Sequence, residues 1–276
     1  MSPLPRQMWR SLEAYHGMIY FAPSAAEAYA ALGITGRSGY FASRSAPMGP
    51  VPAEVVIATF FNFNPALVTR AMDGVWETTT PGAILEARLT AVDAALRPAL
   101  GDDVVRGAEM AEAAALARQA ATGLPLVGRP LFAGHASLPW PEPDHLVLWH
   151  AISLLREFRG DGHIAALTIA GLDGCESLVT HALTSRIPAA VLQSSRAWSD
   201  DEWAAAVDRL RQRGLVEADG DGLTDEGREL RAGVEATTDR LAAAPWDALG
   251  PEGCERLRDL AGPFATAIVE SGVFAF

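Results

Sequence analysis

Three side chains in the segment LREFRGDGH, residues 155–163, could together hold an anion. Arg156 and Arg159 are three residues apart and would share one helical face. The glycines on either side of Asp161 predict a helix break, with a new helix opening near His163. Two guanidinium groups, an imidazole and the free backbone N–H groups of that helix start would suit a carboxylate or a phosphate. In the alternative interpretation, Asp161 only caps the second helix and pairs with Arg159.

Two histidines each follow an aromatic residue, in the pairs Tyr15-His16 and Trp149-His150. If the pairs are equivalent by duplication, the two imidazoles could face each other and bind a metal or haem, or transfer protons. No HExxH motif, nearby cysteine or acidic cluster at ligand spacing accompanies them, so the sequence predicts no metal site and names no cofactor. The alternative is that each histidine is a hydrogen-bonded core or interface residue.

Tyr40 and Arg44 lie in the segment SGYFASRSAPMGP, residues 38–50, whose glycines and prolines predict a loop. Loop side chains of this kind often bind ligands, so we expect Tyr40, Arg44 and the upstream Tyr20 to line a pocket. The alternative is that Arg44 only caps backbone carbonyl groups.

Motifs for covalent catalysis and for nucleotide binding are absent from the sequence. It contains no GxSxG, no P-loop and no GxGxxG after a strand. The segment GLDGCES places Cys175 outside the context of a catalytic thiol, and Cys175 and Cys254 are expected to be buried and reduced. The sequence therefore favours a binding site over a recognisable catalytic centre.

The elements that must position these side chains are almost all helical. Asn64 before Pro65 is the expected N-cap of one helix, and Ser199 with Glu202 forms a capping box for another. Between the helices, a loop rich in proline and glycine spans residues 126–145. Apolar spacing and start signals predict helices at residues 5–20, 24–32, 52–61, 65–73, 82–98, 103–121, 143–158, 163–183, 188–195, 200–213, 225–243 and 252–271.

Segments of the two halves of the chain match each other in order. Three pairs of similar segments contain corresponding residues separated by 134, 136, 145 and 146 positions, and Pro52 corresponds to Pro188 in the second pair. We infer a tandem duplication with insertions, in which residues 1–125 and 146–276 are equivalent halves. The alternative is that alanine-rich helices resemble one another by composition.

The segment WSDDEWAAAVDRLRQRGLVEADGDGLTDEGREL, residues 198–230, resembles the MarR-type winged helix. A helix ends in RLRQRGLV, the stretches LVEA and GLT around DGDG would form a two-stranded wing, and LTDEG opens the next helix. Across its length, with YFAP, GYFASR, ATFFNF and LREFRGDGH, the chain resembles an actinobacterial helix-turn-helix-like family. This resemblance implies a fold and no established activity.

The charges of the winged-helix segment argue against DNA binding. The helix that would read bases begins with Asp200, Asp201 and Glu202, and the wing carries further carboxylates at Glu217, Asp219 and Asp221. From Arg196 to Arg240 there are 7 Arg against 12 Asp and Glu. Carboxylates held against phosphates add repulsion and a desolvation cost.

Bulk composition excludes several classes of protein. The net charge of −12 and the pI near 4.9 disfavour phosphate backbones and anionic membranes as partners. The sequence has no apolar run of membrane-spanning length and no signal-peptide pattern at its start, so we expect a soluble, cytoplasmic protein.

We therefore expect an all-α protein with short β-wings, built as an internal pseudo-dimer of two tandem winged-helix-like halves. Its expected function is small-molecule binding as a sensor or accessory protein. The alternatives are a MarR-like transcriptional regulator and an enzyme of specialised metabolism with a His/Arg site. The expected ligand contacts are His16, Tyr20, Tyr40, Arg44, His150, Arg156, Arg159, Asp161 and His163. Neither the identity of the ligand nor the oligomeric state follows from the sequence.

Overall fold

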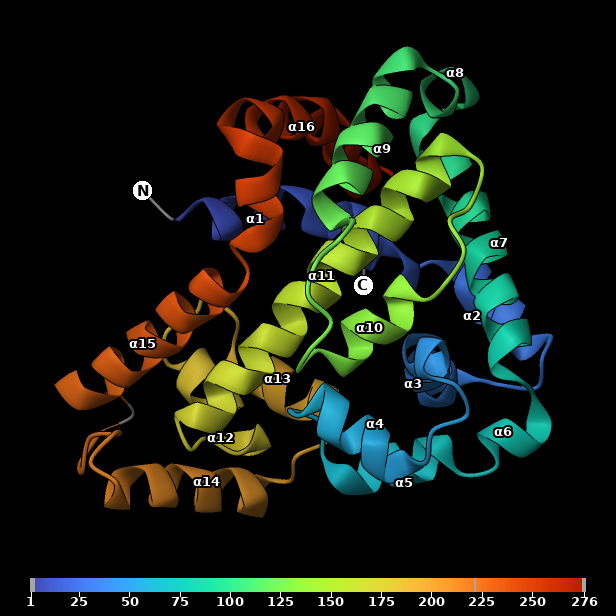
Figure 1. Ribbon diagram of the computed structural model, residues 1–276. Helices are drawn as coiled ribbons and strands as arrows, with labels where there is room; N and C mark the ends of the chain where they lie inside the picture. Colours follow the sequence, from blue (N-terminus) through green and yellow to red (C-terminus); the bar gives the residue numbers. More distant parts are fainter. Residues whose placement is uncertain (1–2, 221, 275–276) are drawn as a thin grey trace. The chain divides into compact units, whose positions relative to one another are not determined.

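The computed structural model describes residues 3–220 and 222–274, and it is built almost entirely from helices (Figure 1). The all-α class predicted from the sequence is confirmed. The described chain forms two compact units. Unit 1 takes in the residues up to Val51, Gly74–Asp161 and those from Leu241 onward, and unit 2 takes in Pro52–Asp73 and Gly162–Arg240. The predicted repeat halves divide the chain differently from these units and stay a prediction.

Unit 1 contains α1 (Leu4–Gly17), η1 (Met18–Tyr20), α2 (Pro23–Ala30), α3 (Gly36–Ser45), η2 (Ala46–Met48), α6 (Val75–Thr78), α7 (Pro81–Leu100), α8 (Asp102–Val105), α9 (Ala108–Ala121), α10 (Pro130–Ala136) and α16 (Ala244–Glu270). Unit 2 contains α4 (Ala53–Phe60), α5 (Pro65–Met72), α12 (Gly174–Ala182), α13 (Ala189–Arg196), α14 (Asp200–Gln212) and α15 (Asp225–Leu241), except the last residue of α15. The long helix α11 (Asp144–Ile169) begins in unit 1 and its last turns belong to unit 2.

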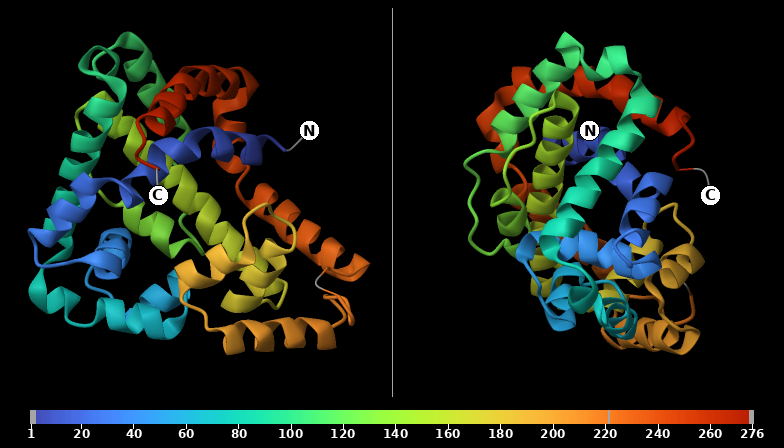
Figure 2. Two further views of the ribbon diagram at one scale, coloured as in Figure 1. Left: turned by 180° about the vertical axis from the view of Figure 1, so that it is seen from behind. Right: turned by 90° about the vertical axis from the view of Figure 1, so that its right-hand side faces the viewer.

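In unit 1, α16 packs against α1 and α9, while α2 and α3 pack against α7 (Figures 1 and 2). Met8, Leu12 and Tyr15 are fully buried on α1, and their spacing of three and four residues places them on one face. Leu257 and Phe264 supply an apolar face to α16 in the same way. Burial of one apolar face therefore holds each of these two helices in place.

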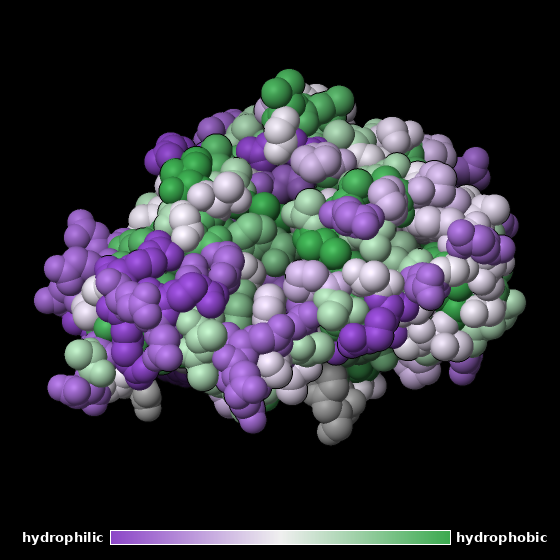
Figure 3. Space-filling view, turned by 90° about the horizontal axis from the view of Figure 1, so that it is seen from below, coloured by the Kyte–Doolittle hydropathy of each residue, from purple (hydrophilic) through white to green (hydrophobic). Residues whose placement is uncertain are grey.

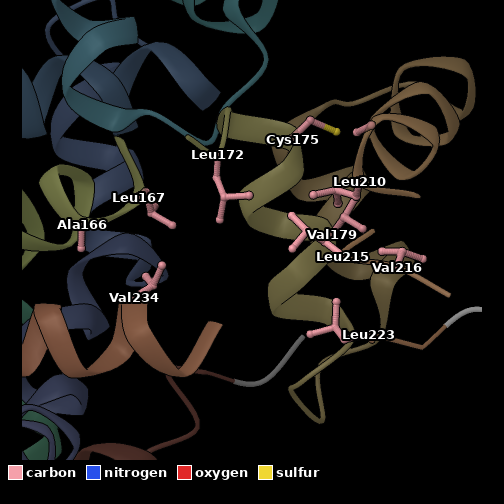
Figure 4. Close-up of a cluster of buried hydrophobic side chains, with 11 residues drawn as sticks. Ala166, Leu167, Leu172, Cys175, Val179, Leu210, Leu215, Val216, Leu223 and Val234 are labelled. Atoms are coloured by element: carbon pink, nitrogen blue, oxygen red, sulfur yellow. The ribbon is translucent and has the colours of Figure 1, made fainter. Parts of the chain in front are cut away.

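In unit 2, buried apolar side chains from α11, α12, α14, α15 and the segment after α14 form one core (Figure 4). Leu172, Cys175 and Val179 follow a helical spacing at α12, and Leu210 comes from α14. Cys175 points toward α14, where its thiol lies 3.9 Å from the backbone oxygen of Glu202. The core fixes α14 by its apolar face and leaves its charged face outside.

The helix pairs α4–α5 and α13–α14 of unit 2 share several local features. α4 follows Pro52 and α13 follows Pro188, and each contains eight residues. The turns after them pass through Phe61 and Ala197, at φ 48° and 60°, the only residues other than glycine with positive φ in the described chain. α5 and α14 then begin after their N-caps, Asn64 and Ser199. Both predicted N-caps are confirmed by side-chain oxygens that accept from backbone N–H groups.

Two local predictions around the candidate site are wrong. The loop predicted at residues 38–50 is instead most of α3 followed by η2. Gly39 is needed there for close packing, because a Cβ atom would lie 2.9 Å from the Tyr29 ring. The helix break predicted at Asp161 is also absent, since α11 continues through Gly160 and Gly162. Two interior glycines cost about 1 kcal/mol each, and the burial of α11 outweighs that cost.

The segment after α14 forms less sheet than the predicted two-stranded wing. A single antiparallel bridge joins Val216 and Leu223 in the described residues. Backbone bonds from Glu217 to Gly222 and from Thr224 to Leu215 flank it. Asp221, which the sequence places in this wing, lies outside the described residues.

The loop expected at residues 126–145 also contains α10, and the helix expected at 103–121 is interrupted at Gly107. No helix in the described part of the chain combines the length and the apolar character needed to cross a membrane.

Candidate functional site

A cluster of buried polar side chains lies inside unit 1. His16 comes from the end of α1, Tyr20 from η1, and Tyr40 and Arg44 from successive turns of α3. α11 supplies Ser153, Arg156 and Glu157 to the same cluster. The structure therefore brings together five of the nine predicted ligand residues: His16, Tyr20, Tyr40, Arg44 and Arg156.

His16 stands in a chain of hydrogen bonds that fixes its tautomer. The Ser153 hydroxyl donates to the Trp149 carbonyl oxygen at 2.8 Å, so it accepts from Nδ1 of His16 at 2.9 Å. Nε2 of His16 then accepts from the Tyr20 hydroxyl at 2.7 Å. The imidazole also stacks on Trp149, with ring centroids 6.0 Å apart. His16 is therefore neutral, with its proton on Nδ1.

The surroundings of the His16–Tyr20 pair favour its uncharged form. Burial lowers the pKa of His16 well below its ordinary value of 6.5, and the positive charges of Arg156 and Arg44 lower it further, against Glu157. Burial also raises the pKa of Tyr20 to about 12, against the same two cations. At neutral pH the Tyr20 oxygen therefore keeps its proton and donates it in a hydrogen bond to Nε2 of His16.

Glu157 is the buried anion of the cluster. Its carboxylate accepts from Nη2 of Arg44 at 3.2 and 3.4 Å and from Nη1 of Arg156 at 2.9 Å. Burial opposes ionisation, but the charges of Arg156 and Arg44 lower the pKa of Glu157 far below its ordinary value. Arg44 also donates to the Tyr40 hydroxyl at 2.8 Å. This one carboxylate thus orients the cations from two helices.

A third guanidinium adds to the positive charge of the cluster. Arg88 of α7 is 7% exposed, donates to the Ser43 carbonyl oxygen at 2.7 Å and lies 5.4 Å from the centre of the Trp149 ring. Its Nη1 approaches Nε2 of His135 at 3.5 Å. Burial and the charge of Arg88 lower the pKa of His135 to about 3, so this histidine is neutral as well.

A small pocket in unit 1 adjoins the cluster through Glu13 and Arg156. Its other walls are mainly apolar and include Trp9 and Trp246, with Arg159 at one side. The guanidinium of Arg159 lies 4.5 Å from the centre of the Trp9 ring. The free space is about 20 Å³, which accommodates roughly one water molecule. A larger ligand requires a lining side chain to move.

The predicted site residues Asp161 and His163 lie apart from the cluster. Asp161 accepts from the backbone N–H of Phe132 at 2.9 Å, and burial raises its pKa to about 6. His163 belongs to unit 2, where its Nδ1 is 2.8 Å from the Thr238 hydroxyl. Because α11 is unbroken, the anion corner predicted from Arg156, Arg159 and His163 does not form.

His150 packs edge-on against Trp140, with ring centroids 4.8 Å apart, and its described contacts do not join it to His16. The Nε2 atom of His150 is buried without a hydrogen-bond partner among the described residues. Burial, with the charges of Arg88 and Arg118, lowers the pKa of His150 to about 4. The expected pairing of the two histidines is therefore not among the contacts of this site.

Sequence reasoning missed the residues that connect the cluster, above all Ser153 and Glu157. Trp149, Ser153 and Glu157 are spaced by four residues along α11 and lie on one helical face. That spacing is visible in the sequence as a polar stripe beside Arg156. The contribution of Arg88 has no comparable local signal, because its partners come from α3 and α10.

The winged-helix segment offers few unengaged cations. Arg209 binds Glu176 at 3.0 Å and Asp173 at 2.6 Å, and Arg213 binds Glu176 at 3.1 Å. Arg211 pairs with the carboxylate of Asp208 within its own helix. Seen from below, hydrophilic side chains gather over the region of α14 and the wing (purple, left in Figure 3). This face is polar, but its arginines are already neutralised by carboxylates.

The start of α14 also contacts a neighbouring turn of unit 2, although its first residues, Asp200, Asp201 and Glu202, are exposed. The side-chain amide of Asn64 donates to both carboxylate oxygens of Glu202, and the backbone N–H of Asn64 donates to the Arg196 carbonyl oxygen. The indole of Trp198 donates to the Asn62 carbonyl oxygen at 2.9 Å. The turn between α4 and α5 thus contacts the turn between α13 and α14.

Metal-binding side chains do not converge in the part of the chain that the structure describes, where no group of three or more His, Cys, Asp or Glu residues could hold an ion. A family model described as a helix-turn-helix family matches residues 5–275, nearly the whole chain. No curated protein and no solved structure matches the chain.

Proposed function

Since the chain belongs to the helix-turn-helix family, we propose that it is a small-molecule-binding protein whose winged helix does not read DNA. The observation that carries the proposal is the polar cluster of unit 1, in which buried His16, Arg44 and Glu157 lie behind the half-buried Tyr20 and Arg156. Buried polar networks of this size cost desolvation energy and are common at binding sites. An apolar pocket beside the network would hold the ligand once a lining side chain moves.

Native mass spectrometry of the purified protein, compared with its denatured mass, tests this proposal. A bound small molecule should appear as added mass that is lost on denaturation. The Y20F and R156Q variants should carry less of it, because both residues lie at the accessible side of the cluster. Equal occupancy in both variants would place the ligand elsewhere and contradict the proposal.

Two features of unit 2 support the proposal that α14 does not bind DNA. The start of α14, which in a winged helix would face the bases, exposes the carboxylates of Asp200, Asp201 and Glu202, and Glu202 also accepts from the Asn64 amide. The cations Arg209 and Arg213 are engaged by Glu176. Fluorescence anisotropy with a random DNA duplex at low salt should show no binding at about tens of micromolar. Salt-sensitive binding below that concentration would favour the alternative of a transcriptional regulator.

An internal repeat explains the turn-to-turn packing. α4 and α13 have equal lengths, follow prolines, and are followed by Phe61 and Ala197, which both have positive φ. The two turns are 136 residues apart in the sequence, the same separation as Pro52 and Pro188. We infer that the N-terminal half carries a degenerate helix-turn-helix, which packs on its C-terminal counterpart as the two chains of a dimer would.

An enzyme is the second candidate, favoured by the 2.7 Å bond between the Tyr20 hydroxyl and Nε2 of His16. In such an enzyme, Tyr20 would donate a proton to the substrate, and His16 with Ser153 would hold the phenol in place. Incubation of any ligand released from the protein with fresh protein, followed by mass analysis, tests this candidate. A ligand that returns unchanged from the wild type excludes turnover on that ligand.

A further inference from the structure

We propose that the pocket lined by Trp9, Arg156 and Trp246 binds a monoanionic carboxylate with a flat apolar body, and that Glu13 occupies the position of its carboxylate. This inference rests on the proposed function and names the class of ligand. It concerns the apolar space beside the buried cluster.

Glu13 is held as a bound carboxylate would be. Its Oε2 accepts from the indole N–H of Trp9 at 2.7 Å, and its Oε1 accepts from Nε of Arg156 at 3.4 Å. An indole donor and a guanidinium that converge on one carboxylate form an anion site. The Arg156 contact is long, and the Glu13 side chain is 36% exposed. A ligand carboxylate that replaces Glu13 would therefore break only a long contact with Arg156, and it would take over the short bond from the Trp9 indole.

The pocket walls suit the rest of such a ligand. Leu12, Ile152 and Leu155 form apolar walls between the rings of Trp9 and Trp246. The present free space is about 20 Å³, and rotation of Glu13 toward solvent adds the volume of its own side chain. A flat ring fits between indole walls because aromatic faces and edges attract one another.

The charge of the adjoining cluster favours an anion over a neutral or cationic ligand. Three buried or half-buried guanidinium groups, on Arg44, Arg88 and Arg156, act on Glu157, the one buried carboxylate among the described residues of the cluster. Glu157 stays fixed by Arg44, so Arg156 is the cation of the cluster that a ligand in the pocket can reach. An excess of positive charge at low solvent exposure is stabilised by one further negative charge.

Isothermal titration with benzoate, benzamide and benzylamine tests the inference. Benzoate should bind, and both other probes should bind about tenfold more weakly or worse, because they lack the charge-assisted bond. The E13A variant should bind benzoate several-fold more tightly, since the competing carboxylate is gone. R156Q and W9F should each weaken benzoate binding.

The matched control is E112A. Glu112 also pairs with an arginine at the surface, Arg256, and its loss changes the net charge by the same amount, but it lies outside the pocket. Its benzoate affinity should equal that of the wild type, which separates a local effect of Glu13 from a change in overall charge.

Three results would overturn the inference. Equal affinity for benzoate and benzamide would remove the anionic class while leaving a small-molecule site in place. An E13A variant that binds benzoate no better than E112A would remove the role of Glu13. The absence of heat with millimolar probes, for wild type and E13A alike, would show that the pocket takes no carboxylate. Native mass spectrometry of the purified protein would still decide the proposed function by itself.

Discussion

The side-chain amide of Asn64 donates to both carboxylate oxygens of Glu202, at 3.0 and 3.1 Å, and so joins the start of α5 to the start of α14. The same side chain accepts from the backbone N–H of Ala66 as the N-cap of α5. One residue therefore stabilises a helix end and the packing of two helix starts.

The N64A variant should lower the free energy of unfolding by about 1–3 kcal/mol, because it removes both the cap and the bond to a charged group. The matched control is N62A. Its side chain makes no hydrogen bond among the described residues, and only its backbone oxygen accepts from Trp198. Urea denaturation measures both variants, and equal losses would contradict the role given to the Asn64 side chain.

The E157Q variant should lower the free energy of unfolding by about 3–5 kcal/mol at pH 7, because two guanidinium groups lose their buried partner. The pKa of Glu157 is lowered in the folded chain, so its stabilisation is complete above the ordinary value of 4.5 and is lost as pH falls below it. The difference between wild type and E157Q should therefore shrink in acid. A constant difference from pH 7 to pH 3 would exclude an ionised Glu157.

His150 should contribute to a loss of stability below pH 6.5. Its pKa in the folded chain is about 4, against 6.5 ordinarily, so the unfolded chain binds one more proton between these values. The free energy of unfolding then falls by about 1.4 kcal/mol per pH unit for this residue as pH decreases, and its contribution is complete above pH 6.5.

H150F keeps a ring against Trp140 and removes the titrating group. Denaturant curves at pH 5 and pH 7.5 should show H150F gaining stability relative to the wild type at the lower pH. No relative change between the two pH values would show that His150 is protonated in the folded chain or accessible to solvent.

Helix positions and caps could be predicted from the sequence because they depend on local patterns. Asn64 before Pro65, and Ser199 with Glu202, have N-cap spacings that act within one helical turn, and both caps form. The continuity of α11 could not be predicted locally. Glycines flank Asp161 and favour a break in the helix. The helix stays continuous because many of its side chains are buried against other helices, which is a tertiary effect.

The candidate site could likewise be predicted only where local patterns decide the structure. Residue type alone points to His16, Tyr20, Tyr40 and Arg44, but the loop that the sequence predicts around Tyr40 and Arg44 is in fact α3. On that helix they are four residues apart, which explains their hydrogen bond. Arg88 could not be found in this way, because its contacts with Ser43 and His135 join three separate helices.

Gly174 allows a close backbone approach in unit 2, because a Cβ atom there would overlap the Phe61 carbonyl oxygen and lie 3.3 Å from the Asn62 Cα atom. Both neighbours are backbone atoms in the turn after α4, and neither can rotate away. The G174A variant should therefore lower the free energy of unfolding by about 2 kcal/mol or more.

G233A is the matched control for this prediction. Gly233 lies exposed within α15, and a Cβ atom added there would meet no other atom within 4 Å, so alanine should be neutral or stabilise the helix by up to about 1 kcal/mol. Opposite signs for the two substitutions in urea denaturation would support the contact of α12 with the Phe61 turn. A G174A variant as stable as G233A would show that this turn does not rest on α12, and would remove one contact between the two proposed halves of the internal pseudo-dimer.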